Sequence, residues 1–265
     1  MSKVFVKDVL THLDNLAPAA MKLDFDNVGL LVGRAAREVC RVLVALDITE
    51  AVIDEAIDLG AQLIVAHHPI WLEPLRQVTD CNQTERKILK LARQDMAAIC
   101  MHTNLDASTG GVNDVLAEAL GLSDTSILLP VGTLDGLPYG LGRVGVLSAP
   151  MTMPDFLAQV KAGVKSEGLR YYDAGRPISR VGVMGGSGSD QLQAAILAGC
   201  DTYVVGEAKY HAFLEARERG INLVEADHYC TENLICEPLR TSMQGAFPEM
   251  DVTVSARHNQ TVKFF

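Results

Sequence analysis

Side chains of types that can bind metals follow apolar, strand-like runs at three places in the sequence. They are, in chain order, His67, His68, Asp106, His228 and Glu232. Imidazole and carboxylate groups together are ligands that Zn, Fe, Mn, Co or Ni accept. In open α/β sheets, ligands bind beyond the carboxyl ends of the strands, where loops aim side chains over a rigid platform. These five residues therefore predict a metal site.

Two adjacent histidines, His67 and His68, emerge where the apolar run Leu63 to Ala66 stops. Neighbours within a strand face opposite sides, but beyond its end the backbone can turn and let the two imidazoles splay. Two-metal hydrolytic sites hold their ions about 3.5–4 Å apart, so the pair favours two divalent metal ions over one. The alternative is that one histidine caps a loop while the other bonds to a backbone carbonyl.

A histidine and a glutamate, His228 and Glu232, stand four residues apart where a helix is expected to begin. Side chains at this spacing lie over one another, so they can reach a single site. The alternative is an ordinary solvated pair on the helix surface. Asp106 supplies the corresponding carboxylate in the first half of the chain, four residues after His102. His102 is either a ligand or a group that orients Asp106 or donates to substrate, and we favour the second role.

The segment Gly206 to His211 also follows a strand-like run, which places Glu207 and His211 near the same cleft. With His102, these two are the candidate catalytic groups, because each could carry a proton during hydrolysis. The alternative is a solvated helix start, since acidic residues favour helix N-termini. A glycine-rich loop, Met184 to Asp190, could cradle an anion with its amides, but it lacks the lysine of a P-loop.

The elements that must position these residues alternate between strands and helices. Expected strands are 41–46, 62–66 and 97–101, then 180–184, 202–205 and 222–226; expected helices lie near 50–60, 84–95, 111–120, 190–199, 207–219 and 231–243. Glycines fit the left-handed position after four of these helices: Gly60, Gly121, Gly199 and Gly220. The pattern predicts an α/β fold with two similar lobes, mainly parallel sheets, and the metal site in the cleft between them.

An internal duplication supports the two lobes, because residues 55–66 resemble residues 194–205. The turn-rich stretch 123–145 has the composition of a domain boundary. We therefore expect a first α/β lobe at 1–125 and a second at 126–234. A C-terminal helix and strand occupy 235–265, and the sequence leaves open whether they return to the first lobe's sheet.

The composition narrows the class of protein. A net charge of -10 gives no strong nucleic-acid signal, because phosphate contacts need clustered Lys and Arg. The six cysteines are scattered without a Cys-x-x-Cys pair, as expected of reduced, mostly buried thiols. Neither a signal-peptide core nor an apolar run long enough for a membrane span is evident, so we expect a cytoplasmic protein with no membrane contact.

These residues in this order resemble the NGG-interacting-factor (Nif-three-like) family of dinuclear metal proteins, whose members are often described as GTP cyclohydrolase I type 2. The resemblance runs over nearly the whole chain and rests on these motifs: Asp26-Asn27-Val28-Gly29-Leu30, Ala66-His67-His68-Pro69, His102-Thr-Asn-Leu-Asp106, Gly206-Glu207-x-Lys209-x-His211 and His228-x-x-x-Glu232. It implies two α/β lobes, two divalent metals held by His67, His68, Asp106, His228 and Glu232, and a toroidal homohexamer. Some members carry an inserted domain, for which this chain is too short.

The leading hypothesis is a metal-dependent hydrolase, since paired metals lower the pKa of water and stabilise a developing oxyanion. The small-molecule substrate is expected to be nucleotide-like or a phosphoester, and the resemblance includes ring opening of GTP. The alternative is a non-catalytic metal-binding scaffold or regulatory interaction protein. The same ligands would serve both, so the residues alone leave the two open.

Overall fold

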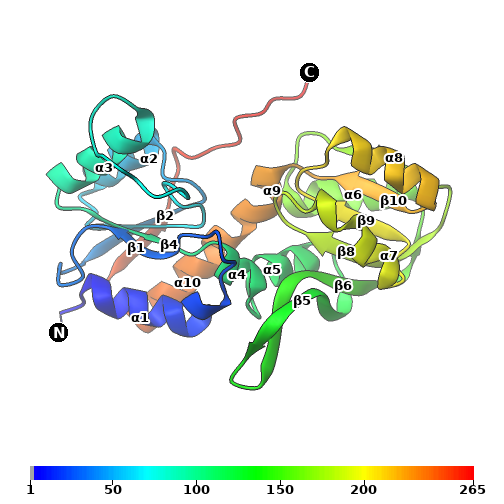
Figure 1. Ribbon diagram of the computed structural model, residues 1–265, viewed down its shortest axis with the longest axis horizontal. Coiled ribbons are helices and arrows are strands. Elements are labelled where there is room, and N and C mark those ends of the chain that lie inside the picture. The colour runs from blue at the N-terminus through cyan, green and yellow to red at the C-terminus, as the bar shows by residue number, and fades with distance from the viewer. Residues whose placement is uncertain (1–2) are drawn as a thin grey trace. The chain divides into compact units, whose positions relative to one another are not determined.

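The computed structural model describes residues 3–265, which divide into two units (Figure 1). The first unit contains the described residues up to Leu105 together with Ile235–Asn259. The second contains Asp106–Leu234 together with Gln260–Phe265. Each unit is built around its own sheet.

The sheet of the first unit has the strand order β1-β4-β3-β2-β11. Its strands are β1 (Gly29–Val32), β2 (Arg41–Ala45), β3 (Leu63–Ala66), β4 (Ala97–Cys100) and β11 (Asp251–Val254). All neighbours pair in parallel except β1, which runs antiparallel to β4. Because β3 and β4 are parallel neighbours, their carboxyl ends deliver the residues that follow them to the same edge of the sheet.

Helices cover both faces of this sheet, α2 and α3 on one and α1 and α10 on the other (Figure 1). Their bounds are α1 (Val6–Leu16), α2 (Glu50–Leu59), α3 (Gln83–Arg93) and α10 (Cys236–Ala246), and η1 (Ala19–Met21) is a short 3-10 turn. α2 begins at Thr49, whose hydroxyl accepts from the amide of Val52, and ends at Gly60 in the left-handed conformation. Because both faces are covered, β3 and β4 are buried along their whole length.

The second unit has a mixed sheet with the order β5-β6-β8-β9-β10-β7. Its strands are β5 (Ser123–Leu134), β6 (Leu137–Met151), β7 (Arg170–Tyr172), β8 (Ile178–Met184), β9 (Thr202–Val205) and β10 (Asn222–Glu225). β8, β9 and β10 are parallel, and the remaining pairings are antiparallel. The parallel centre again brings three strand ends, and the loops that follow them, to one edge.

Alternating residues of this central sheet enter two separate apolar cores. Val204 and Val224 pack with α5 and α6, whereas Tyr203, Val205 and Leu223 pack with α7 and α8. The helices are α5 (Val112–Ala119), α6 (Met153–Val164), α7 (Leu192–Leu197) and α8 (Tyr210–Arg219), with the 3-10 turn η2 (Ser189–Gln191). Three short elements lie at or near the ends of the second unit: α4 (Thr103–Ala107), α9 (His228–Glu232) and η3 (Asn233–Ile235).

The α/β class and the two lobes are confirmed, and the expected strands and helices lie where the sequence placed them. Gly60, Gly121, Gly199 and Gly220 all have positive φ, as predicted. The expectation of mainly parallel pairing holds for the first sheet only. Two cysteines, Cys40 and Cys81, are exposed, whereas the other four are buried.

The turn-rich stretch 123–145 is not irregular, because it forms the long hairpin of β5 and β6. Asp135 and Gly136 both have positive φ (50° and 79°), as a tight two-residue hairpin turn requires. At Gly140 a Cβ atom would lie 2.2 Å from the carbonyl oxygen of Leu129 on the paired strand. The glycines of this stretch therefore serve a turn and a close strand approach, which composition alone does not distinguish from a linker.

In the first unit, β11 pairs in parallel with β2 and so adds a strand from the end of the chain.

Candidate metal centre

Three imidazoles gather at the carboxyl edge of the first unit's sheet. His67 and His68 directly follow β3, and His102 follows β4. One ring nitrogen from each lies within 4.8 Å of one from each of the others. The ring centroids are 4.9 Å apart for His67 and His68, 5.3 Å for His67 and His102, and 5.6 Å for His68 and His102.

The same ring atom, Nδ1, is held by an acceptor in all three histidines. Nδ1 of His67 lies 2.8 Å from the carbonyl oxygen of Met101, Nδ1 of His68 lies 2.8 Å from Asp47, and Nδ1 of His102 lies 2.7 Å from Asp26. Carbonyl and ionised carboxylate oxygens only accept, so Nδ1 carries the proton in each ring. An imidazole with its proton on Nδ1 can bind a metal through Nε2, the arrangement common in histidine ligands.

Asp47 holds His68 and also a histidine from the end of the chain. Its two carboxylate oxygens accept from Nδ1 of His68 and from Nε2 of His258, the latter at 2.9 Å. Burial raises the pKa of Asp47, but the hydrogen bonds from His258 and His68 outweigh it and leave that pKa below its ordinary value. The sequence analysis missed both residues, although Asp47 also follows the carboxyl end of a strand, β2.

The segment around His258 is fixed by a second carboxylate, Glu55 of α2. Glu55 accepts from the hydroxyl of Ser255, from the amide of Ala256 (2.8 Å) and from the amide of Arg257 (3.1 Å). This turn directs His258 toward Asp47. Asp47, which holds the candidate ligand His68, is therefore itself positioned by His258, through contacts between residues some 200 positions apart in the sequence.

Asp26 performs the corresponding task for His102. It is 7% exposed and accepts from Nδ1 of His102 and from the amide (2.9 Å) and hydroxyl of Thr103. Burial raises the pKa of Asp26, but the hydrogen bonds from His102 and Thr103 outweigh burial and leave that pKa below its ordinary value. The motif Asp26-Asn27-Val28-Gly29-Leu30 therefore contributes a carboxylate that orients His102.

We expect Asp26→Asn to destabilise the protein by about 1–3 kcal/mol at pH 7, the cost of a disrupted buried hydrogen-bond group. Because the folded pKa of Asp26 is depressed, its stabilising effect is fully present above its unfolded pKa of about 3.9 and is lost progressively as the pH falls from there through the folded pKa. Urea unfolding from pH 7 to pH 3 should therefore show the difference in stability between the two proteins begin to shrink below about pH 4. Asp24→Asn, at an exposed neighbour, should change little throughout, and a difference independent of pH would contradict the assignment.

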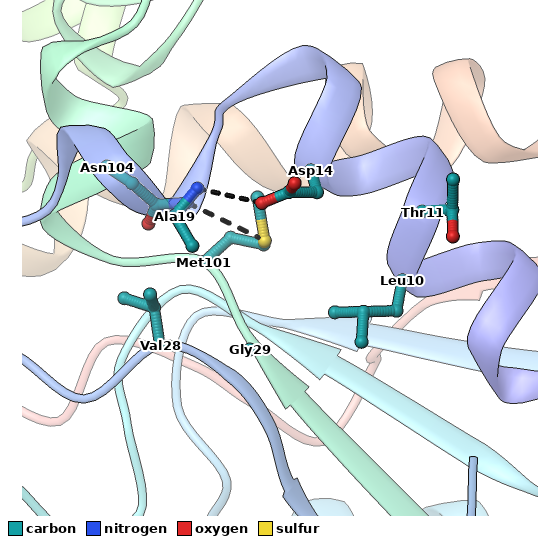
Figure 2. Close-up of a pocket in the computed structure, with 8 residues that line it drawn as sticks. All are labelled: Leu10, Thr11, Asp14, Ala19, Val28, Gly29, Met101 and Asn104. Atoms are coloured by element: carbon teal, nitrogen blue, oxygen red, sulfur yellow. Dashed lines mark hydrogen bonds between the residues drawn. The ribbon is translucent and has the colours of Figure 1, made fainter.

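A cavity of about 320 Å³ in the first unit lies between α1 and the start of β1 (Figure 2). Met101 lines it with its side chain while its carbonyl holds His67. Asp14 accepts from the amide of Ala19 at 2.7 Å, and the amide nitrogen of Asn104 donates to the carbonyl of Ala17. The polar side chains of this cavity are thus engaged with the chain itself.

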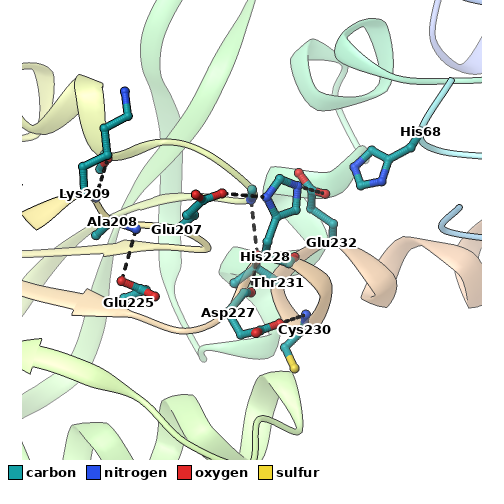
Figure 3. Close-up of polar contacts among 12 residues, drawn as sticks. His68, Glu207, Ala208, Lys209, Glu225, Asp227, His228, Cys230, Thr231 and Glu232 are labelled. Atoms are coloured by element: carbon teal, nitrogen blue, oxygen red, sulfur yellow. Dashed lines mark hydrogen bonds and ion pairs between the residues drawn. The ribbon is translucent and has the colours of Figure 1, made fainter. Parts of the chain in front are cut away.

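In the second unit, His228 and Glu232 form one face of the short helix α9, as their spacing predicted (Figure 3). Nε2 of His228 lies 3.0 Å from a carboxylate oxygen of Glu232, which is 5% exposed. A carboxylate oxygen of Asp106 lies within 4.8 Å of one of Glu232. Glu207, which follows β9, lies 3.4 Å from Nδ1 of His228. The unit therefore gathers two carboxylates and an imidazole, with a third carboxylate behind the ring.

The loop after β8 makes room for this group. A Cβ atom on Gly186, whose φ is +60°, would lie 2.1 Å from Oε1 of Glu232 and 3.2 Å from Nε2 of His228. Two amides of the possible anion cradle are already engaged, because the amide of Gly185 donates to Asn113 and that of Gly186 to Thr231. The loop instead provides a space that only glycine leaves open, directly beside the carboxylate and the imidazole.

His211 is exposed at the start of α8, and its neighbour Lys209 pairs with Asp190 at 2.9 Å. Burial disfavours the thiolate form of two cysteines, since it raises the pKa of Cys230 to about 11 and that of Cys236 to about 12. Among residues 3–265, none of the helices combines the length and the apolar composition that a membrane span needs.

The donor sets fit divalent transition metals. In the first unit, three imidazoles are held by oxygen acceptors at Nδ1, the usual arrangement around ligating histidines. In the second, carboxylates and an imidazole meet beside a glycine that keeps the space open. Mixed nitrogen and oxygen donors of this kind suit Zn, Fe, Mn, Co or Ni.

Comparisons with known protein families, sequences and structures all point to the same family. The sequence model of Duf34/NIF3 (NGG1p interacting factor 3) matches residues 4–261. A Clostridium perfringens protein named GTP cyclohydrolase 1 type 2 homolog is 34% identical over 228 residues, or 86% of each chain. A hypothetical protein of Staphylococcus aureus has a solved structure that covers 100% of both chains with 30% identity and a TM-score of 0.91. A Bacillus cereus protein related to NIF3, 24% identical over the full length of both chains with a TM-score of 0.94, shares the fold.

Proposed function

Because the chain belongs to the Duf34/NIF3 family, we propose that it is a metal-dependent hydrolase that binds two divalent metal ions. The proposed ligands are His67, His68, Asp106, His228 and Glu232. The observation that best supports this is the group of three imidazoles in which an oxygen acceptor holds Nδ1 of each ring, so that each would bind a metal through Nε2. Histidines that only cap loops have no need of this shared orientation.

Bound metals would lower the pKa of water toward neutrality and stabilise negative charge that develops on the substrate. The chain's own residues supply the rest. Asp47 and Asp26 fix the tautomers of His68 and His102, and the Met101 carbonyl fixes that of His67. The grouping of His102 with the other two imidazoles favours a place for it beside the metals.

Proton transfer is assigned to groups that lie next to the ligands. Glu207 contacts His228 and is exposed at its carboxylate, so it can exchange protons with solvent and with a reacting group. His211 is the outer candidate, because it is exposed at the start of α8. The substrate is proposed to be nucleotide-like or a phosphoester, which includes the GTP named in the relatives' descriptions.

Metal analysis and a substrate panel test this function. Protein purified without added metal should contain close to two ions per chain, and with Mn, Fe, Co, Ni or Zn it should hydrolyse at least one nucleotide or phosphoester. Tight metal binding with no turnover across nucleotides and esters would identify a metal-binding scaffold instead. A chain that holds no metal would overturn the proposal entirely.

We also propose that the chain assembles as a toroidal hexamer, as its family resemblance implies. Light scattering on the purified protein should give six times the mass of one 28.6 kDa chain. A stable monomer would remove this part of the proposal without affecting the metal centre.

Asp47→Asn tests the orientation of His68. An amide can donate as well as accept, so it no longer enforces a proton on Nδ1, and we expect metal affinity to fall about 10- to 100-fold. Competition titration with a chelating dye measures the change. Asp54→Asn, on the exposed side of α2 and paired only with Lys90, is the matched control. Equal affinities for the two variants would show that Asp47 has no part in orienting the ligand.

A further inference from the structure

A cavity of about 330 Å³ in the second unit opens beside His228. Glu207 comes from the end of β9, whereas Glu225, Asp227 and His228 come from the end of β10. Arg170 of β7 and Phe264 near the end of the chain form further walls. The cavity therefore shares a residue, His228, with the proposed metal centre.

Phe264 gives the cavity a flat apolar wall. A Cβ atom on Gly168 would lie 2.5 Å from Cδ1 of Phe264, so the absence of a side chain at Gly168 makes a seat for the ring. The phenylalanine is still 42% exposed, and Val262, another lining residue, is 56% exposed. An aromatic face that is seated on one side and exposed beside a cavity is suited to stacking on a planar ligand.

The polar walls are mainly hydrogen-bond acceptors (Figure 3). Glu225, whose side chain is 17% exposed, accepts at Oε2 from Arg170 and from the amide of Ala208, and its Oε1 remains for a ligand. Glu207 contributes a second carboxylate, 58% exposed. Asp227 contributes a third, which also accepts from the amide of Cys230.

The cavity's one guanidinium is already engaged. Arg170 donates to Glu225 and to the carbonyl of Ala208 (2.8 Å), and its Cζ lies 5.3 Å from the ring centroid of Phe213. Carboxylates thus outnumber cations here, and like charges at short range repel. A phosphate is disfavoured in this cavity, whereas N–H donors are favoured.

We propose that this cavity binds the ring of the substrate, a planar nitrogen heterocycle with N–H donors. The ring stacks on Phe264 and donates to Glu225, so that the heterocycle rather than a phosphate lies next to His228. This inference rests on the proposed metal-dependent function and narrows its substrate to molecules that present such a ring. Phe264 and Glu225 are then the residues that determine specificity.

Calorimetric titration of the metal-loaded protein tests the inference with two probes. Guanosine carries a planar ring with N–H donors and no phosphate, whereas ribose 5-phosphate carries a phosphate and no ring. We expect guanosine to bind with an affinity that depends on Phe264, whereas any binding of ribose 5-phosphate at the metals should not depend on Phe264. Binding of ribose 5-phosphate with no binding of guanosine would overturn the proposal.

Variants at the aromatic wall sharpen the test. Phe264→Leu should weaken guanosine binding by about 5- to 100-fold, as loss of a base-stacking ring does, while Phe264→Tyr should retain it. Metal affinity should stay unchanged in both. Tyr171→Leu removes an exposed aromatic side chain of β7 that does not line the cavity, and it should have no effect. Equal guanosine affinities for Phe264→Leu and the natural chain would refute the stacking role.

The two proposals fail in different ways. If a simple phosphoester is hydrolysed but no heterocycle binds, the metal-dependent function stands and the ring-binding cavity is wrong. If guanosine binds with the expected dependence on Phe264 but no substrate is turned over, the cavity stands and the hydrolase is wrong.

Discussion

Replacing His67 by alanine is expected to lower metal content and to abolish metal-dependent hydrolysis. His67 is 0% exposed, and its Nδ1–H donates to the carbonyl of Met101, so the proposed metal bond would be made by Nε2. Loss of a residue that merely orients a ligand reduces metal affinity about 10- to 100-fold, so loss of the ligand itself should exceed that range. Elemental analysis and hydrolysis rates on the same samples measure the effect.

A buried histidine also contributes to packing, so folding must be measured beside function. His12→Ala is the matched control, because His12 is a partly buried histidine of the same unit that bonds to Ser242 at 2.9 Å and stands apart from the three grouped imidazoles. Both variants should unfold cooperatively in urea. Only His67→Ala should lose metal, and full metal content in a folded His67→Ala protein would remove His67 from the proposed ligands.

Gly186→Ala should weaken metal binding more than 100-fold, although it replaces none of the proposed ligands. The added methyl would lie 2.1 Å from Oε1 of Glu232 and 3.2 Å from Nε2 of His228, so the carboxylate must move away from the imidazole. A displaced ligand is lost as effectively as a deleted one, and the change should therefore exceed the 10- to 100-fold range of orienting residues. A chelator competition assay on the folded variant measures it.

The matched control separates the steric effect from backbone strain. Gly175 also has positive φ (+71°), but a Cβ atom there would meet nothing within 4 Å. In both alanine variants the free energy of unfolding should fall by roughly 1–2 kcal/mol, because alanine is strained in the left-handed region. Thermal unfolding should show this loss of stability in both. Gly175→Ala should bind metal normally, and an equal loss in both variants would attribute the defect to stability alone.

The sequence was sufficient to predict the parallel strands and the residues at their ends. Short apolar runs bounded by left-handed glycines such as Gly60 and Gly220 mark element ends locally, and the parallel order then brings β3 and β4 to one edge. Residue type then indicated the candidate site residues, because imidazoles and carboxylates repeatedly follow those apolar runs. The prediction of His67, His68 and His102 near one another needed only local patterns and one rule of sheet geometry.

The residues that orient the site were not predictable in the same way. Asp47 and His258 meet across 211 positions, and Asp26 and His102 across 76, so no local pattern relates them. The sequence shows Gly186 as part of a glycine-rich loop. That a side chain at this position would collide with Glu232 is seen only in the folded chain. The hairpin of β5 and β6 was missed because turns and close strand approaches use the same residues as linkers.

The return of β11 to the first sheet has a consequence for biosynthesis. During translation the amino-terminal 105 residues emerge first, yet one edge of their central sheet, at β2, stays uncovered until Asp251–Val254 has left the ribosome. Asp47 likewise gains its contact with His258 only after a further 211 residues have been added. Unlike a domain that folds as it is made, this unit can complete its sheet and fix Asp47 only after Asp106–Leu234 of the second unit has been synthesised.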